Sequence, residues 1–337
     1  MTTTIADTLQ AATKKLSELS DTPRLDAEVL LAMATGKSRT YFRAWPEKPL
    51  TAEEDSKFQM LLEQRLVGHP IAHLTGIREF WSREFIVTPD VLIPRPETEL
   101  LVELALRLID GCGSKATHPP FTPNADELSR HSRECRYPEH REVNADCPPW
   151  RLGSGNPCRN DGEIYNEKTI RIADLGTGSG AIAITLALEL PKAAITALDL
   201  SPAALSVAAE NASRLGASNI RFILSDWFAA LPITEHFDLI VSNPPYIAEH
   251  DRHLQQGDVR FEPSLALTSG PDGLNAIRRI VNEAPSRLNP GGRLFFEHGY
   301  DQADRVAELL RTAGFAEIES FPDLQGHLRV SAGRVPR

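Results

Sequence analysis

Residues 170–180, which read IRIADLGTGSG, decide the fold class of this chain. The apolar first half is typical of a buried strand, and alternating glycines follow it without a spacer. Glycine is needed where the backbone turns sharply and where a ligand approaches it closely. A helical pattern over residues 181–190 comes next and ends at Pro191. A strand, a glycine-rich turn and a helix in this order predict the start of a doubly wound α/β sheet.

Acidic and aromatic residues follow the next two predicted strands. Strand 194–198 ends at Asp199, where an acid can accept hydrogen bonds from both hydroxyls of a ribose. Strand 220–224 precedes Asp226, which can accept from an adenine amino group. Trp227 comes next and either covers the adenine ring or packs between a strand and a helix. The glycines read G-x-G-x-G rather than the dinucleotide G-x-G-x-x-G, and in this setting they predict an adenosine ligand.

A fourth apolar run, FDLIVS at 237–242, leads directly into Asn243-Pro244-Pro245-Tyr246. Proline cannot donate to a strand ladder, so the strand ends here, and Asn243 stands at the sheet edge that faces the ligand crevice. The asparagine amide and the free carbonyls of Pro244 and Pro245 suit a planar NH2 group, and Tyr246 offers a face for stacking. The alternative for an isolated Asn-Pro-Pro is a strand stop followed by a turn.

The composition is that of a globular protein with a core, since 41% of the 337 residues are hydrophobic. The length suggests two domains. A net charge of −10 argues against a broad nucleic-acid surface. The N-terminus has no basic stretch leading into an apolar one, and no stretch approaches the length of a membrane span. We therefore expect a cytoplasmic protein, a monomer, that contacts neither a membrane nor nucleic acid directly.

The chain before the sheet divides into two parts. Residues 1–75 carry apolar residues at helical spacing and predict a small helical bundle. The positions expected on its buried faces are Ile5, Leu9, Ala12, Leu16, Leu19, Leu25, Val29, Leu30, Met33, Phe58, Leu61, Leu62 and Leu66. Residues 76–110 predict a hairpin with β-rich pieces on either side of Pro89-Asp90, followed by a helix over 97–109. Arg95 is expected to be either a linker residue that forms a salt bridge or a charged hinge beside the crevice.

Residues 111–168 show no periodicity and hold all four cysteines of the chain. A structureless stretch of this length is typical of a disordered insertion. The cysteines lack the close spacing of a zinc ribbon or finger, so we predict no metal there. Nor do we expect one at His69 and His73, because Pro70 lies between them and breaks the helix that such a pair needs. His298, at the end of strand 293–297, is expected to pack rather than to react.

The chain resembles the class I S-adenosylmethionine-dependent methyltransferases that act on planar amino or amide nitrogens. Four features carry this resemblance: the glycine loop, Asp199, the Asp226-Trp227 pair and the Asn-Pro-Pro-Tyr tetrapeptide. Four further stretches narrow this resemblance: LDAE at 25–28, LIPRPETE at 92–99, SDWF at 225–228 and DVRFEP at 258–263. They look like the bacterial release factor glutamine-N5 methyltransferase family. The resemblance covers the chain except residues 111–168, which that family does not normally carry.

The resemblance implies an α/β fold, a Rossmann-like class I methyltransferase doubly wound sheet with a small N-terminal helical-bundle domain. Residues 1–75 would recognise the substrate, 76–110 would link, and 169–337 would bind S-adenosylmethionine and catalyse. The reaction would methylate the side-chain nitrogen of the glutamine in the Gly-Gly-Gln loop of a class I release factor. The implied cofactor-binding residues are Gly176, Thr177, Gly178, Ser179, Gly180, Asp199, Asp226, Trp227 and Asn243, with Asp174 as a candidate for orienting the ammonium group. The implied catalytic residues are Asn243, Pro244 and Tyr246, and Pro245 joins them in binding substrate.

Three other functions stay open. A glutamine methyltransferase for a ribosomal protein shares the tetrapeptide, although 93–99 and 226–228 favour a release factor. An adenine-N6 nucleic-acid methyltransferase would place a flipped base in the same pocket, but the acidic net charge argues against it. A non-catalytic cofactor-binding module predicts a degraded tetrapeptide, whereas this one is intact.

Overall fold

The computed structural model describes residues 3–110 and 169–337, so the predicted insertion lies outside the described residues. The first helices of the chain are α1 (Ile5–Leu16), α2 (Pro23–Thr35), α3 (Arg39–Ala44), α4 (Ala52–Val67) and α5 (Ile71–Thr75). Local sequence sets their ends. Thr51 and Glu54 form a reciprocal capping box at the start of α4, and Gly68 ends it in the left-handed conformation. The predicted helical bundle is confirmed.

The core of this bundle contains most of the predicted apolar positions, including Leu9, Leu30 and Phe58. Four predictions were wrong, because Leu19, Leu25, Met33 and Leu66 are all exposed. Leu19 lies beyond the end of α1. On α2 the buried face carries Asp26 and Glu28 instead of Leu25 and Met33. Each acid has an arginine partner, and Asp26 accepts from Arg65 Nε at 2.9 Å, which makes its burial tolerable.

The hairpin of the linker is present, but its turn lies elsewhere than predicted. Strands β1 (Ile77–Phe80) and β2 (Arg83–Ile86) pair in antiparallel register. The two residues between them, Trp81 and Ser82, both have positive φ, as tight two-residue hairpins require. Residues 91–93 form no strand. The predicted helix begins as a short 3-10 turn, η1 (Pro96–Thr98), and continues as α6 (Glu99–Asp110).

The rest of the described chain builds a mixed sheet in the order β5-β4-β3-β6-β7-β9-β8, in which β9 runs antiparallel to its neighbours. The strands are β3 (Arg171–Leu175), β4 (Ala194–Asp199), β5 (Ile220–Leu224), β6 (Phe237–Ser242), β7 (Leu288–Glu297), β8 (Ala316–Pro322) and β9 (Leu328–Arg334). The helices are α7 (Ala181–Glu189), α8 (Pro202–Leu215), α9 (Asn275–Glu283) and α10 (Ala303–Thr312). The doubly wound α/β prediction is confirmed.

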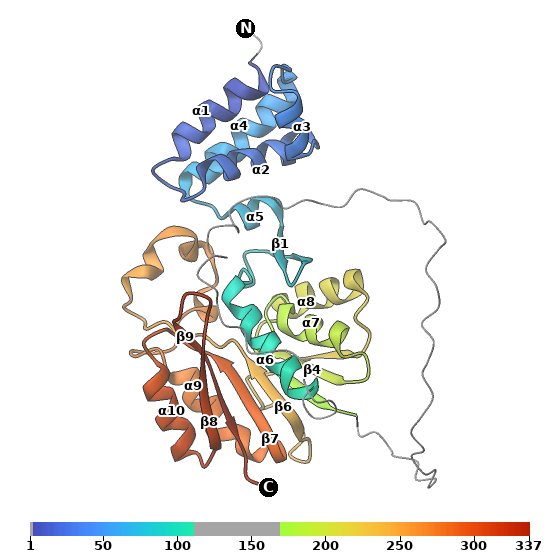
Figure 1. Cartoon of the computed structure of the whole chain (residues 1–337), viewed down its shortest axis with the longest axis vertical. Coiled ribbons are helices and arrows are strands. Elements are labelled where there is room, and N and C mark those ends of the chain that lie inside the picture. Colours follow the sequence, from blue (N-terminus) through green and yellow to red (C-terminus); the bar gives the residue numbers. More distant parts are fainter. Residues whose placement is uncertain (1–2, 111–168) are drawn as a thin grey trace, which may run out of the picture. The chain divides into compact units, whose positions relative to one another are not determined.

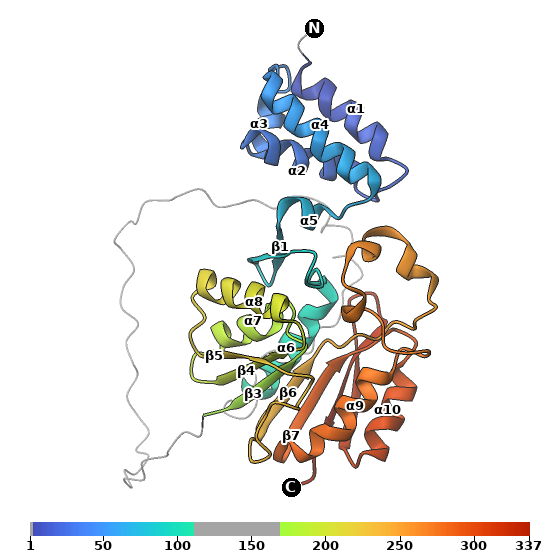
Figure 2. The same cartoon turned by 180° about the vertical axis from the view of Figure 1, so that it is seen from behind.

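Two core layers cover the two faces of the sheet, with α6, α7 and α8 on one side and α9 and α10 on the other (Figures 1 and 2). Alternate strand residues enter opposite layers, as the pleat requires: Leu239 packs toward α7 and Ile240 toward α9. Helix α9 ends at Glu283, and a 3-10 turn, η5 (Ala284–Ser286), follows because Pro285 cannot continue an α-helix.

The chain reverses its winding direction between β3 and β6. Successive connections run from β3 to β4 to β5, and the chain then returns to place β6 on the other side of β3. Open α/β sheets bind ligands at such a switch point, beyond the carboxyl ends of the strands. Among the described helices, none has the length and apolar character to cross a bilayer.

Candidate active site

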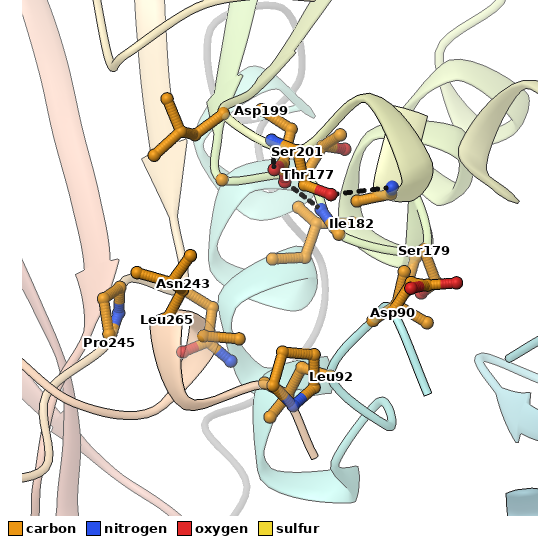
Figure 3. Close-up of a pocket in the computed structure, with 18 of the residues that line it drawn as sticks. Asp90, Leu92, Thr177, Ser179, Ile182, Asp199, Ser201, Asn243, Pro245 and Leu265 are labelled. Atoms are coloured by element: carbon orange, nitrogen blue, oxygen red, sulfur yellow. Dashed lines mark hydrogen bonds between the residues drawn. The ribbon is translucent and has the colours of Figure 1, made fainter. Parts of the chain in front are cut away.

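A cavity of about 520 Å³ opens at the carboxyl ends of β3, β4, β5 and β6, within the size range of small-molecule sites (Figure 3). Its lining includes Gly176, Thr177, Gly178, Ser179, Asp199, Asp226, Trp227, Asn243 and Pro245, all predicted from sequence. The linker contributes residues 89–92, Pro94 and Thr98, and the segment after η3 (Gly257–Phe261) contributes Pro263, Leu265 and Ala266. Among the described residues, four predicted site candidates lie outside this lining: Asp174, Gly180, Pro244 and Tyr246.

The glycine loop is held by the neighbouring strand. The N–H groups of Gly176 and Thr177 both donate to the Leu198 carbonyl, at 2.8 and 2.9 Å. Gly178 has a φ of 55°, and a side chain there would extend into open space. This backbone conformation favours glycine and leaves room for a ligand. Gly180 instead serves packing, because a Cβ there would lie 3.2 Å from the Cβ of Ala208 on α8.

Asp199 closes the loop from the end of β4. Its two carboxylate oxygens each accept a backbone N–H at 2.8 Å, one from Gly178 and one from Ser201 (Figure 3). Burial raises the pKa of Asp199, and these backbone hydrogen bonds oppose the rise. A carboxylate oxygen has more than one lone pair, so each can still accept from a ligand hydroxyl.

Asp174 lies deeper than the loop. It is fully buried and does not line the cavity, and its Oδ2 accepts from the Thr177 hydroxyl at 2.7 Å. Burial raises its pKa to about 7. In the structure Asp174 therefore supports the loop through Thr177 from below the cavity wall.

Asp226 and Trp227 form the wall beyond β5. Both Asp226 oxygens accept from Arg279 Nη1, at 2.8 and 2.7 Å, so this carboxylate is already paired while it borders the cavity. The Trp227 ring lies over the loop, since a Cβ on Gly176 would be 3.7 Å from Trp227 Cζ3. Trp227 has a φ of 53°, an uncommon conformation for a bulky residue. Such backbone strain is typical of functional sites.

Asn243 faces the cavity from the end of β6, opposite Asp199 and Thr177 (Figure 3). Sheet register brings it there, because Ser242 pairs with Leu175 of β3 on one side and with Phe296 of β7 on the other. Pro244 is buried. Tyr246 is anchored at its hydroxyl and at its carbonyl, which accepts from Gln302 Nε2 at 2.9 Å.

Two polar side chains that hydrogen-bond to side chains of the tetrapeptide were not predicted from the sequence. Thr98 accepts from Asn243 Nδ2 at 3.0 Å, and Glu297 accepts from Thr98 at 2.7 Å and from the Tyr246 hydroxyl at 3.0 Å. Thr98 lies in the PRPETE stretch, which was recognised without a role for the threonine. Glu297 carries no local signal, because only the β6–β7 register places it beside Asn243.

Arg95 and His298 take up structural roles. Arg95 pairs with the buried carboxylate of Glu262, which also accepts from the Ile93 N–H at 3.0 Å. This is the salt-bridging alternative rather than a hinge beside the crevice, since Arg95 does not line the cavity. His298 is fully buried and its Nε2 lies 2.8 Å from the Ser331 hydroxyl.

Comparisons with known proteins give concordant matches along the chain. Residues 7–76 match the model of the PrmC N-terminal domain, and residues 166–321 match that of a methyltransferase domain. A release factor glutamine methyltransferase of Burkholderia pseudomallei is 44% identical, with 97% of each chain covered. Proteins of the same name from Bordetella pertussis and Escherichia coli are 43% and 41% identical, over 92% and 94% of this chain and 94% of each relative.

Proposed function

The chain belongs to the release factor glutamine methyltransferase family, and from this premise we propose that it methylates a glutamine side-chain nitrogen in a release factor, using S-adenosylmethionine. The proposal rests on one observation, which is that two kinds of binding group line the same cavity. The glycine loop and Asp199 suit an adenosine ligand, and Asn243 suits an amide. We infer that the acceptor is the glutamine of the Gly-Gly-Gln loop of class I release factors, and that the enzyme acts in the cytoplasm.

The residues of the cavity fit the methyl donor. Asp199 would accept from the ribose hydroxyls, Trp227 would cover the adenine, and Gly176–Ser179 of the loop would admit the methionine end. Asp226, already paired with Arg279, would accept from the adenine amino group. The donor, when bound, supplies an electrophilic methyl group on a sulfonium.

The chemical difficulty lies in the acceptor, because the lone pair of an amide nitrogen is delocalised into its carbonyl. Holding that nitrogen in line with the methyl carbon can supply about 7 kcal/mol of the barrier. Asn243 Oδ1 would accept one N–H bond at the cavity, and the Pro244 carbonyl, which is next in the chain but outside the described lining, would accept the other; this favours the pyramidal nitrogen of the transition state. Pro245, which lines the cavity, and Tyr246, which lies outside that lining, would flank the amide plane. The nitrogen takes the methyl carbon, the carbon–sulfur bond breaks toward sulfur, and one N–H proton then leaves to solvent.

Methyl transfer from tritiated S-adenosylmethionine tests this proposal. We expect label on a purified release factor and none on the same factor with its Gly-Gly-Gln glutamine replaced by glutamate. Equal labelling of both proteins would show that another atom is the acceptor and would overturn the proposal.

A further inference from the structure

A buried hydrogen-bond chain connects the two polar residues of the tetrapeptide. Asn243 Nδ2 lies 3.0 Å from Thr98 Oγ1, which lies 2.7 Å from Glu297 Oε2. The other Glu297 oxygen lies 3.0 Å from the Tyr246 hydroxyl. Thr98 is 4% exposed and Glu297 is 1% exposed, so water does not compete for these bonds. The chain therefore couples the conformations of four residues from three elements.

The direction of this chain follows from donor and acceptor counts. An ionised carboxylate only accepts, so Thr98 and Tyr246 each direct their single proton to Glu297. The Thr98 oxygen is then left with lone pairs and must receive a proton from Asn243. Only the NH2 end of the Asn243 amide has protons, so that end turns to Thr98. The oxygen, Oδ1, stays free for the cavity.

We propose that Thr98 and Glu297 are positioning residues that fix the orientation of the Asn243 amide, so that the cavity presents an oxygen and selects an acceptor bearing N–H bonds over a carboxylate. The inference rests on the proposed function, because it specifies how the site tells glutamine from glutamate. A reversed Asn243 amide would present N–H groups to the cavity. It would repel the substrate amide and suit a carboxylate, so the side-chain orientation decides the specificity.

The protonation state of Glu297 controls the same orientation. A protonated Glu297 can donate to Thr98, which frees the threonine proton for Asn243 Oδ1 and permits the reversed amide. Burial raises the pKa of Glu297, whereas hydrogen bonds from Thr98 and Tyr246 and the charge of Arg329 on β9 lower it, and the charge of Glu97 raises it. The net direction is upward, so loss of activity on acidification begins above the ordinary glutamate range.

The test compares Thr98→Val, which keeps the shape and removes the hydroxyl, with Thr98→Ser, which restores it. Affinities are measured by calorimetry for a release factor with glutamine and for its glutamate variant, both with S-adenosylhomocysteine present. For Thr98→Val we expect the preference for glutamine over glutamate and the kcat each to fall about tenfold, the factor set by one hydrogen bond of about 1.4 kcal/mol. S-adenosylhomocysteine affinity should stay within about twofold, and Thr98→Ser should recover both quantities.

Glu297→Gln supplies a second, independent variant. Its amide can donate to Thr98 at any pH, so kcat should fall and the acid limb of the wild-type kcat profile should disappear. A Thr98→Val enzyme with unchanged preference for glutamine, or a Glu297→Gln enzyme that keeps the acid limb, would overturn the inference while leaving the function intact. Failure of the wild-type enzyme to methylate the release factor would instead overturn the proposed function.

Discussion

Asn243→Ala separates methyl transfer from cofactor binding. Asn243 lies at the switch point of the sheet, lines the cavity and donates to Thr98 with Nδ2, which leaves Oδ1 as the proposed acceptor. The substitution removes the proposed acceptor of the substrate N–H bond. It leaves the glycine loop, Asp199 and Trp227 in place, because their hydrogen bonds among the described residues go to partners other than Asn243.

The substitution should lower both the kcat and the free energy of unfolding, by different amounts. Removing a hydrogen-bonding group that acts on the transition state lowers kcat by about 10²–10³-fold, equivalent to roughly 3–4 kcal/mol. The folded state loses one partly buried hydrogen bond, to Thr98, which lowers the free energy of unfolding by about 1 kcal/mol. The affinity for S-adenosylmethionine should change by no more than about threefold. The loss of activity is therefore far larger than the losses in stability and cofactor binding.

The assay is steady-state methylation of a release factor, with calorimetric titration of S-adenosylmethionine into the same preparation. Asn219→Ala is the matched control, because Asn219 Nδ2 donates to the carbonyls of Leu190 and Ala193, both at 3.0 Å, away from the cavity. It should lose at least as much stability and keep wild-type kcat. Wild-type turnover in Asn243→Ala would refute the amide-binding mechanism.

Three further outcomes are expected. Asp199→Asn should weaken S-adenosylmethionine binding by about tenfold or more in calorimetry, and an unchanged Kd would contradict the ribose contact. Burial raises the pKa of Asp174 from 3.8 to about 7, so the folded protein holds this proton between those values and the stability due to Asp174 falls as pH rises through that window. Urea unfolding at pH 5 and 7 should show a smaller fall for Asp174→Asn, and an identical fall in both proteins would argue against the shift. Replacing residues 113–166 with a Gly-Ser linker should preserve kcat, because residues 89–98 and 176–266 supply the described lining of the cavity. Inactivity of a folded replacement would contradict the predicted insertion.

Parts of the sheet could be predicted at positions where the residue type permits only one local structure. Gly178 needs its positive φ, and the proline pair after Asn243 must end a strand, so both carboxyl-edge motifs were visible in the sequence. Pairing of β3 with β6 then brings the two motifs together. Both motifs follow parallel strands and so lie at the same edge of the sheet. The cavity could therefore be predicted from the sequence.

Other features depend on contacts that sequence patterns do not contain. The hairpin turns at Trp81 and Ser82, two bulky or polar residues in a conformation usually marked by glycine or asparagine. Asp26 and Glu28 are buried on α2 where Leu25 and Met33 were expected, because Arg65 and Arg39 from other segments pair with them. Glu297 becomes a site residue only through the register of β7. Each of these requires knowledge of a partner distant in sequence.

The central claim is that one cavity transfers a methyl group to a glutamine amide of a release factor. Peptide mass spectrometry tests it most directly, on a release factor, a ribosomal-protein mixture and duplex DNA, each incubated with the enzyme and S-adenosylmethionine. The account predicts one added methyl group on the Gly-Gly-Gln peptide and none elsewhere. A methyl group on a ribosomal-protein glutamine or on adenine, with the release factor unmodified, would contradict it.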